Sequence, residues 1–405
     1  MEILEKILLI VFYIVQFWLI SYFLIVVLFV IADILAIKIS PKINWAVQQQ
    51  KNYSFAAIVP LHQNIDFLEP ILDSLLKQRY KDVHFFVIAD DCPAVTLPFT
   101  DERIHLLYPE TPLHSKIKSI QLALNHIDEN KFDAIAIFDA DNLVHPDFFS
   151  IMNAYFNKGY RAVQSIILPK NTDTTFARLD TINDQYYNFI DRWSPSQLNL
   201  SAHIAGRGTV TDLKLYKSVS YKNFFGGFDK KLQCDLASQT IIAYASEAKL
   251  FDEKVSDGNS MQRQRTRWIN AYFRYFSEAR KIFLKGLLSG NFRLMFFGYN
   301  NMRPPLFIQL LLSFLCIGIC AFLLQPFLWV WAAVIGAYLL SFLYIVIFKN
   351  SVLTAKQSAI TMFKIPLFVS RQIKALLNIQ SANKQFLQTN NYKAVFIDDI
   401  LVSER

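Results

Sequence analysis

The sequence is poor in glycine and cysteine. It has 11 glycines in 405 residues and neither a GxGxxG nor a P-loop pattern, so a phosphate-binding loop built from glycine backbone is not expected. The four cysteines, Cys92, Cys234, Cys316 and Cys320, lack metal-site spacing, and we predict that they are reduced thiols. The formal net charge is +8, but no basic run is interleaved with aromatic residues in the polar middle of the chain, so nucleic acid is not an expected partner.

Charge is absent from two long stretches. Ile7–Ala32 and Pro304–Phe348 contain no Asp, Glu, Lys or Arg, and 53% of the chain is hydrophobic, which is more than a soluble protein needs. The first stretch has no Pro, Gly or small-residue cleavage site and exceeds the roughly 20 residues that cross a bilayer, so we expect one retained, tilted anchor helix. The second is too long for one helix and is expected to break at Gln325–Pro326, giving spans near Leu306–Leu324 and Phe327–Phe348.

Flanking charges predict the orientation. Lys38 and Lys42 follow the first stretch, and seven Lys or Arg but no Asp or Glu occur from Lys349 to Lys393. By the positive-inside rule, the polar middle and the tail face the cytoplasm, and the basic tail suits an anionic leaflet. We therefore predict a multi-pass membrane protein with an anchor (1–37), a cytoplasmic domain (38–270), interfacial amphipathic helices (271–303), two spans (304–348) and a basic tail (349–405). Within the tail, Leu353–Ile379 is expected to be a second amphipathic segment.

Apolar runs alternate with helical patterns in the polar middle. The sequence predicts buried strands over Phe55–Pro60, His84–Ala89 and Asp133–Phe138, and helices over Ile65–Gln78 and Lys116–Asn125. This alternation predicts an α/β fold with a mostly parallel sheet and helices on both faces. Ligands are then expected along the carboxyl edge of the sheet.

Acidic residues stand at two of these strand ends. Asp90 and Asp91 end the second strand, and Asp139 and Asp141 follow the third. Two carboxylates one residue apart can bind a hard cation such as Mg²⁺ or Mn²⁺ that leaves positions open for phosphate oxygens, so a metal-bound diphosphate is the natural ligand. An isolated pair of this kind could equally be a solvated turn.

Seven segments resemble, in order, the motif set of membrane-anchored family 2 glycosyltransferases with a GT-A fold. That group includes cellulose, hyaluronan and poly-N-acetylglucosamine synthases, with ceramide glucosyltransferases as relatives. The order of all seven is more specific than any one motif. Spread over about residues 55–270, they are AAIVPLHQN (56–64), VIADDCPAV (87–95), KIKSIQLALNHI (116–127), FDADNLVHPDFF (138–149), IAGRGTVTDLKLY (204–216), QCDLASQTII (233–242) and QRTRW (264–268).

The resemblance implies roles for residues on the donor side. Asp90 and Asp91 match the positions that grip the base and ribose of the nucleotide. Asp139 and Asp141 match the DxD motif, with Asp141 expected as the direct metal ligand. Lys118 lies at the family's lysine-bearing helix start near the nucleotide, although IKS replaces the usual Gly-Lys-Gly.

The resemblance also implies roles on the acceptor side. Asp235 matches the last acid of the TED motif, the general base, although Cys234 stands where the family usually has Glu and Asn64 where it often has an acid. The QxxRW motif, which closes over the diphosphate and the acceptor sugar, is matched by Gln264, Arg265, Arg267 and Trp268.

Each motif has a plainer interpretation when it is taken alone. Asp235 could cap a helix, and Lys118 could be a solvated helix charge. QRTRW could be a basic surface turn, with Trp268 as a membrane-interface anchor. It is the joint order of the motifs that favours a catalytic site.

These residues can perform a sugar transfer. A metal ion with Arg265 and Arg267 can neutralise a leaving diphosphate, and one base without a covalent nucleophile implies a single displacement with inversion. We expect an inverting, metal-dependent hexosyltransferase that uses a nucleotide-sugar, a UDP-sugar foremost, to extend a cell-surface polysaccharide at the bilayer. Single-sugar transfer to a lipid-linked acceptor is the alternative, and a non-catalytic scaffold or transporter is the third. With three spans, export of a polymer would call for a partner subunit or self-association.

Overall fold

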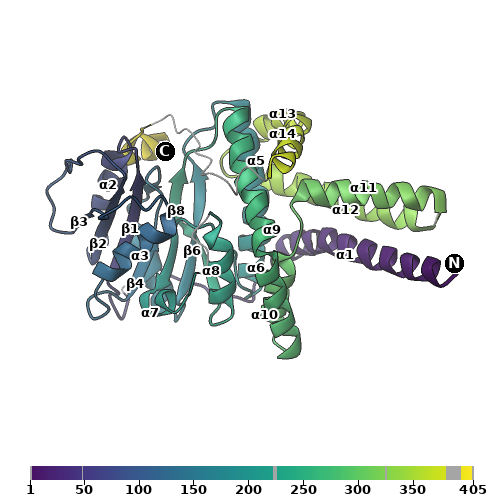
Figure 1. The fold of residues 1–405 in the computed structure, drawn as a ribbon, viewed down its shortest axis with the longest axis horizontal. Coiled ribbons are helices and arrows are strands. Elements are labelled where there is room, and N and C mark those ends of the chain that lie inside the picture. Colours follow the sequence, from purple (N-terminus) through teal and green to yellow (C-terminus); the bar gives the residue numbers. More distant parts are fainter. Residues whose placement is uncertain (1, 48, 222–225, 324–325, 380–393, 404–405) are drawn as a thin grey trace.

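One eight-stranded sheet forms the centre of the protein. The computed structural model describes residues 2–47, 49–221, 226–323, 326–379 and 394–403. The strand order is β3-β2-β1-β4-β7-β6-β8-β5, and Figure 1 shows this sheet at one end of the molecule, with α1, α11 and α12 projecting from the other. The strands are β1 (Phe55–His62), β2 (Val83–Asp90), β3 (Ile104–Leu107), β4 (Ala134–Ile137), β5 (Leu143–Val144), β6 (Ala162–Pro169), β7 (Thr209–Asp212) and β8 (Ile242–Asp252).

The sheet is mostly parallel and helices cover both of its faces. Strands β1 to β4 pair in parallel, as do β6 and β8, whereas β7 and β5 pair antiparallel with their neighbours. Side chains of β1 alternate between two cores: Phe55 packs with α2 and α4, and Ala56 with α3, α7 and α8, as the period of a strand requires. The predicted α/β fold is confirmed.

The helices of the sheet domain follow the predicted alternation. The prediction for residues 116–125 is confirmed by α3, while α2 begins at Leu68 rather than Ile65 because Ile65–Phe67 form a turn that the Leu68 amide closes on the Ile65 carbonyl. The helices of this part are α2 (Leu68–Leu76), α3 (Lys116–His126), α4 (Phe148–Asn157), α5 (Thr175–Asn188), the π-helix η1 (Phe189–Trp193), α6 (Ser194–Gln197), α7 (Leu213–Lys217) and α8 (Phe228–Ala237).

Two helices of the described chain are long and apolar enough to cross a membrane on their own. They are α1 (Glu2–Ile34) and α12 (Pro326–Phe348). A third span is possible if α10 (Phe292–Asn301) and α11 (Leu306–Leu323), which meet at an angle of 82°, form one bent span. The three projecting helices pack together through residues such as Phe23, Cys320 and Trp331, so the chain has a membrane-associating part. The predicted break at Gln325–Pro326 lies partly outside the described residues.

One long helix joins the sheet domain to the membrane helices. Helix α9 (Gly258–Leu288) carries QRTRW and continues across the predicted boundary at residue 270. It lies very close to α10, because a Cβ on Gly286 would stand 2.2 Å from the Met295 nitrogen and one on Gly298 would stand 2.3 Å from the Phe283 nitrogen. The two glycines therefore allow the backbones of α9 and α10 to touch.

The described part of the tail packs on the sheet domain. Helix α14 (Ile365–Leu377) lies against α9, α13 (Ala355–Met362) lies against α5, and α15 (Ile397–Ser403) lies against α2, where Lys77 Nζ is 2.7 Å from an Asp398 oxygen. Residues 380–393 of the predicted basic tail lie outside the described residues. All four cysteines are free, as predicted.

Candidate active site

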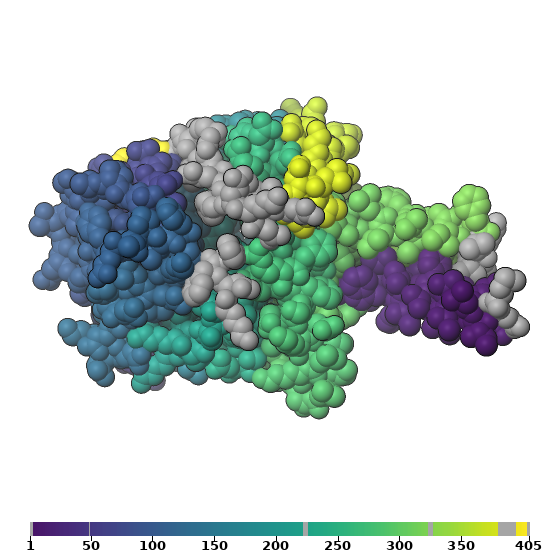
Figure 2. All heavy atoms as spheres, in the orientation of Figure 1, coloured from purple at the N-terminus to yellow at the C-terminus, as the bar shows by residue number. Residues whose placement is uncertain are grey.

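A cavity of about 930 Å³ lies at the carboxyl edge of the sheet. Its walls come from the ends of β1, β4 and β8, the first turn of α8, α9, and the residues just before α11. Figure 2 shows the sheet domain, drawn in blue and teal, at one end of the molecule and the projecting helices, drawn in purple and green, at the other. The residues that line the cavity come from the sheet domain, from α9 and from the segment just before α11. The site therefore stands between a soluble domain and a membrane-associating part.

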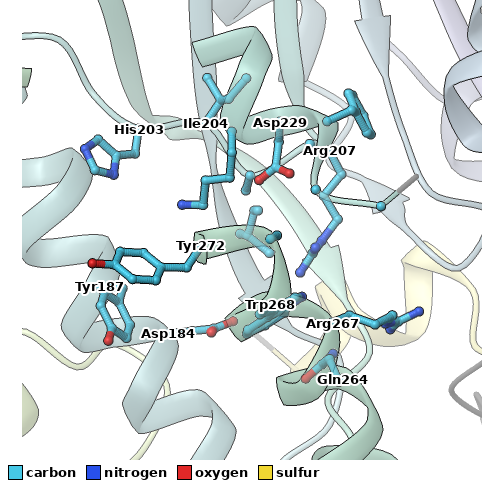
Figure 3. Close-up of a pocket in the computed structure, with 18 of the residues that line it drawn as sticks. Asp184, Tyr187, His203, Ile204, Arg207, Asp229, Gln264, Arg267, Trp268 and Tyr272 are labelled. Atoms are coloured by element: carbon cyan, nitrogen blue, oxygen red, sulfur yellow. The ribbon is translucent and has the colours of Figure 1, made fainter. Parts of the chain in front are cut away.

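The structure brings six of the sequence-predicted residues to this cavity. Four others, Asp90, Asp91, Lys118 and Asp235, are not among the described residues that line it. Figure 3 shows Arg207, Arg267, Trp268 and Asp229 around the same space. The six are Asp139, Asp141, Gln264, Arg265, Arg267 and Trp268.

The DAD pair ends the central strand β4 and lies in a strongly charged environment. Lys116 Nζ, from the first residue of α3, bonds to Asp139 and lies 3.0 Å from the Gly206 carbonyl oxygen. Burial opposes the ionisation of Asp139, but Lys116 and Arg207 outweigh it and hold its pKa below the usual value. Burial, with Asp252 and Asp139 close by, raises the pKa of Asp141 to about 7. The two carboxylates of the DAD pair therefore differ in the direction of their pKa shifts.

Arg207 is a cavity residue that the sequence analysis did not single out. It stands between Gly206 and Gly208, whose φ angles are +70° and +63°, and a Cβ on Gly208 would lie 2.2 Å from Ser165 Oγ. This glycine-flanked turn, visible in the sequence as GRG, directs the guanidinium to Asp252 at 2.6 Å. Burial alone would lower the pKa of Arg207, but Asp252 and Asp139 raise it above the usual value. It is a permanent cation beside the DAD pair.

The QRTRW segment forms a rigid wall on α9. The buried Arg265 pairs with Asp180 of α5 and lies 4.2 Å from the Trp268 ring centroid and 5.2 Å from that of Phe368. Arg265 is thus committed to protein contacts that position Trp268, which is 38% exposed. Arg267 is the cation of this motif that acts near Asp139, although burial, the largest influence, lowers its pKa.

The predicted nucleoside-binding carboxylates lie beside the cavity. Asp90 is buried and accepts hydrogen bonds from the backbone N–H groups of Leu113 and His114, at 2.6 and 2.8 Å. Its neighbour Asp91 has a φ of +53° and accepts a hydrogen bond from Gln63 Nε2 at 2.8 Å. Asp90 ties the end of β2 to the chain before α3.

The structure places Lys116, two residues before the predicted Lys118, at the cavity. Lys118 is exposed on α3, whereas Lys116 lines the cavity and bonds to Asp139. Residues two apart on a helix face different directions, so only one of the two lysines can reach the strand ends. The role of Lys118 stays a prediction from the family resemblance, in which IKS replaces the usual Gly-Lys-Gly.

The predicted base, Asp235, lies in the last turns of α8, away from the cavity. Its carboxylate pairs with Lys231, one turn earlier on the helix. Asp229, in the first turn of the same helix, lines the cavity. The start of α8 is pressed against α9, because a Cβ on Gly227 would lie 2.4 Å from the Ala271 Cβ. Six residues along a helix amount to about 240° of rotation, so the two carboxylates face different sides.

Comparisons with known proteins agree with this architecture. A family model described as Glycosyltransferase like family 2 matches residues 52–271, more than half of the chain. The solved structure of the mannosyltransferase PcManGT from Pyrobaculum calidifontis, in complex with GDP-Man and Mn²⁺, is similar with a TM-score of 0.54 and 13% identity, covering 92% of this chain and 97% of that one. TarS 1–349 from S. aureus, in complex with UDP, has a TM-score of 0.42 and 12% identity, covering 84% and 95%. A search of curated protein sequences finds no significant match.

At such low sequence identity, similarity to a solved structure shows only the fold. This fold is GT-A, with apolar helices toward both ends of the chain. The family match adds what the fold alone does not. The chain belongs to the Glycosyltransferase like family 2, and its sheet edge carries the charged cavity of a sugar-transferring enzyme.

Proposed function

We propose that this glycosyltransferase takes a sugar from a nucleotide-diphosphate donor and passes it to a glycan or glycolipid acceptor at the membrane surface. One observation carries the proposal. Carboxylates after β4, three cations and an aromatic ring meet in a single cavity at the carboxyl edge of the sheet, which is where open α/β sheets bind ligands. The cations are Lys116, Arg207 and Arg267.

A divalent cation fits the donor side of the cavity. The described residues include no group of three or more His, Cys, Asp or Glu side chains arranged to hold a metal by themselves. Asp139 and Asp141 would therefore share Mg²⁺ or Mn²⁺ with phosphate oxygens of the donor, a common arrangement for Mg²⁺. The raised pKa of Asp141 marks a carboxylate that an added cation would stabilise. When bound, the ion would neutralise charge on the leaving diphosphate. The Mn²⁺ and GDP-Man in the PcManGT complex support this proposal.

The chain's own cations complete the leaving-group site. Lys116, Arg207 and Arg267 would hold the diphosphate and stabilise the charge that develops as the sugar–phosphate bond breaks. Trp268 offers its ring face to a sugar, and Arg265 keeps that ring in place. The nucleoside roles of Asp90 and Asp91 remain predictions from the family resemblance.

We propose Asp229 as the base that activates the acceptor. A carboxylate at the cavity wall can take the proton of the acceptor hydroxyl. The acceptor oxygen then bonds to the anomeric carbon, and the nucleoside diphosphate leaves with the electron pair of the broken bond. One such displacement inverts the anomeric centre. The role predicted for Asp235 rests on the family resemblance alone, since its carboxylate pairs with Lys231 and lies outside the cavity wall.

The membrane arrangement supports two acceptor classes. Extension of a cell-surface polysaccharide, with a partner subunit or self-association for export, is the function predicted from the motif set. Transfer to a lipid-linked acceptor is favoured by a specific observation, because the cavity extends to Arg303, Pro304 and Pro305 at the start of α11. Exposed apolar side chains on α9 and α10, such as Leu288 and Phe292, support seating of this region at the bilayer surface.

Measuring nucleoside diphosphate release from a panel of UDP- and GDP-sugars, with purified protein and membrane extracts as acceptor, tests the proposed activity. Release with one donor that disappears in Asp141→Asn is the expected result. Release from none of the donors, or equal release by the variant, would contradict it.

The orientation and the division into segments are proposals as well. We propose that residues 38–303 and the tail face the cytoplasm in a multi-pass arrangement, on the basis of the lysines that follow α1. Protease added outside right-side-out vesicles should then spare this domain. Its cleavage from outside would overturn the orientation.

A further inference from the structure

The cavity has a second polar centre at the end nearest the membrane helices. Figure 3 shows His203 and Tyr187 across the cavity from Arg207 and Arg267. We call this centre the membrane-end cluster, and it comprises Asp191 and Arg192 of η1, His203, Lys230 of α8 and Arg303.

Positive charge exceeds negative charge in the membrane-end cluster. Arg303 is 2.6 Å from Asp191, so these two charges compensate each other. Burial lowers the pKa of His203 to about 3, although Asp191 opposes this, and its ring is therefore neutral at pH 7. Two cations remain, Lys230 and Arg192.

These two cations lack a carboxylate partner in the part of the chain that the structure describes. Arg192 Nε donates to the His203 carbonyl oxygen at 3.2 Å, which leaves its charge uncompensated. Lys230 forms no ion pair with any described carboxylate, including the adjacent Asp229, although it acts electrostatically on Asp191 and His203. Cations that line a cavity without a carboxylate partner are available to bind an anionic ligand.

The membrane-end cluster lies at the base of the helices that associate with the membrane. Phe189 and Ile190, which precede Asp191 on η1, pack in the same apolar cluster as Phe23 of α1 and Trp331 of α12. Arg303, Pro304 and Pro305 join α10 to α11 and line the same cavity. A ligand in this place would have an apolar part in the bilayer and an anionic group in the cavity.

We infer that the membrane-end cluster binds the phosphate group of an amphiphilic acceptor, while the donor diphosphate binds at the opposite end of the cavity. The inference rests on the proposed function and names the class of acceptor. A phosphate offers several oxygens to an ammonium and a guanidinium at once, and both groups are common phosphate ligands. A neutral glycan would leave Lys230 and Arg192 uncompensated. The phosphate anchors the acceptor, and the hydroxyl that receives the sugar points toward the donor end.

Direct binding tests this without knowledge of the sugar. Purified full-length protein in dodecyl maltoside is titrated in a calorimeter with decyl phosphate, decanol and inorganic phosphate. It is titrated separately with UDP and with GDP, each in the presence of Mn²⁺. The variants are Lys230→Gln and Arg192→Gln in the membrane-end cluster and Lys116→Gln at the donor end. Lys214→Gln, exposed on α7 and outside the cavity wall, is the matched control for a lost lysine charge.

Decyl phosphate should bind more tightly than inorganic phosphate and decanol. Each membrane-end variant should weaken that binding by about 10- to 100-fold, as expected for one charge-assisted hydrogen bond. Lys116→Gln and Lys214→Gln should leave it unchanged, and Lys230→Gln should keep its affinity for UDP, which also shows that the variant is folded.

Three results would overturn the inference. Equal decyl phosphate affinity in wild type and both membrane-end variants would exclude the cluster, and a loss confined to Lys116→Gln would place the phosphate at the donor end. Inorganic phosphate binding as tightly as decyl phosphate would mean a free anion rather than a lipid headgroup. A wild-type protein that binds neither UDP nor GDP refutes the proposed function itself, so the two failures are distinguishable.

Discussion

Helix α8 has two acidic residues that could act as the base: Asp229, proposed from the geometry, and Asp235, implied by the family motif. Replacing them one at a time distinguishes the two assignments. Asp229→Asn keeps the size of the side chain and removes only its ability to accept a proton. Asp229 forms no ion pair with a residue that the structure describes, so little stability should be lost. If Asp229 is the base, kcat should fall by about 10²–10⁴-fold, while donor affinity stays near that of the wild type.

Asp235→Asn is the matched comparison on the same helix. It removes an i,i+4 pair with Lys231, which is typically worth about 0.3–0.5 kcal/mol of stability, and leaves the cavity wall intact. Its kcat should therefore remain within a few-fold of wild type. Single-turnover release of nucleoside diphosphate, with donor affinity measured by titration of both variants, distinguishes loss of the base from loss of binding. A large fall in kcat for Asp235→Asn with near-normal Asp229→Asn would refute the geometric reasoning and restore the base implied by the motif.

Three further predictions concern the donor end and its support. A chelator should abolish transfer and added Mg²⁺ or Mn²⁺ should restore it, with Asp141→Asn binding the donor poorly; full turnover in chelator would exclude the metal. Arg265→Met should lower the free energy of unfolding by about 3–5 kcal/mol, because it leaves the buried Asp180 carboxylate without its partner. Thermal unfolding should show partial recovery when Asp180→Asn is added, and no recovery would mean that the pair is not coupled. Gly208→Ala should destabilise the protein by at least about 1 kcal/mol, since its φ of +63° is unfavourable for any residue with a Cβ, and a donor titration should show weaker binding because Arg207 is displaced.

The sequence alone determined the parts of the protein that depend on local pattern. The apolar runs that became β1, β2 and β4 are short and mostly buried, so their strand character could be predicted without tertiary information. The charge-free stretches became α1, α11 and α12, because segments of that length and composition have few other stable environments. The placement of the DAD pair at a strand end followed from the same reasoning.

Only the tertiary structure decided which charged side chains meet. The phase of α3 selects Lys116 rather than Lys118, and the early start of α8 brings Asp229 rather than Asp235 to the cavity wall. Arg265 matches the motif, but it is committed to Asp180, 85 residues away in the chain. A motif specifies residue types in order, whereas the direction of each side chain depends on helix phase and on partners brought close by folding. For that reason the sequence could predict the residue types at this sheet edge but not every side chain that lines the cavity.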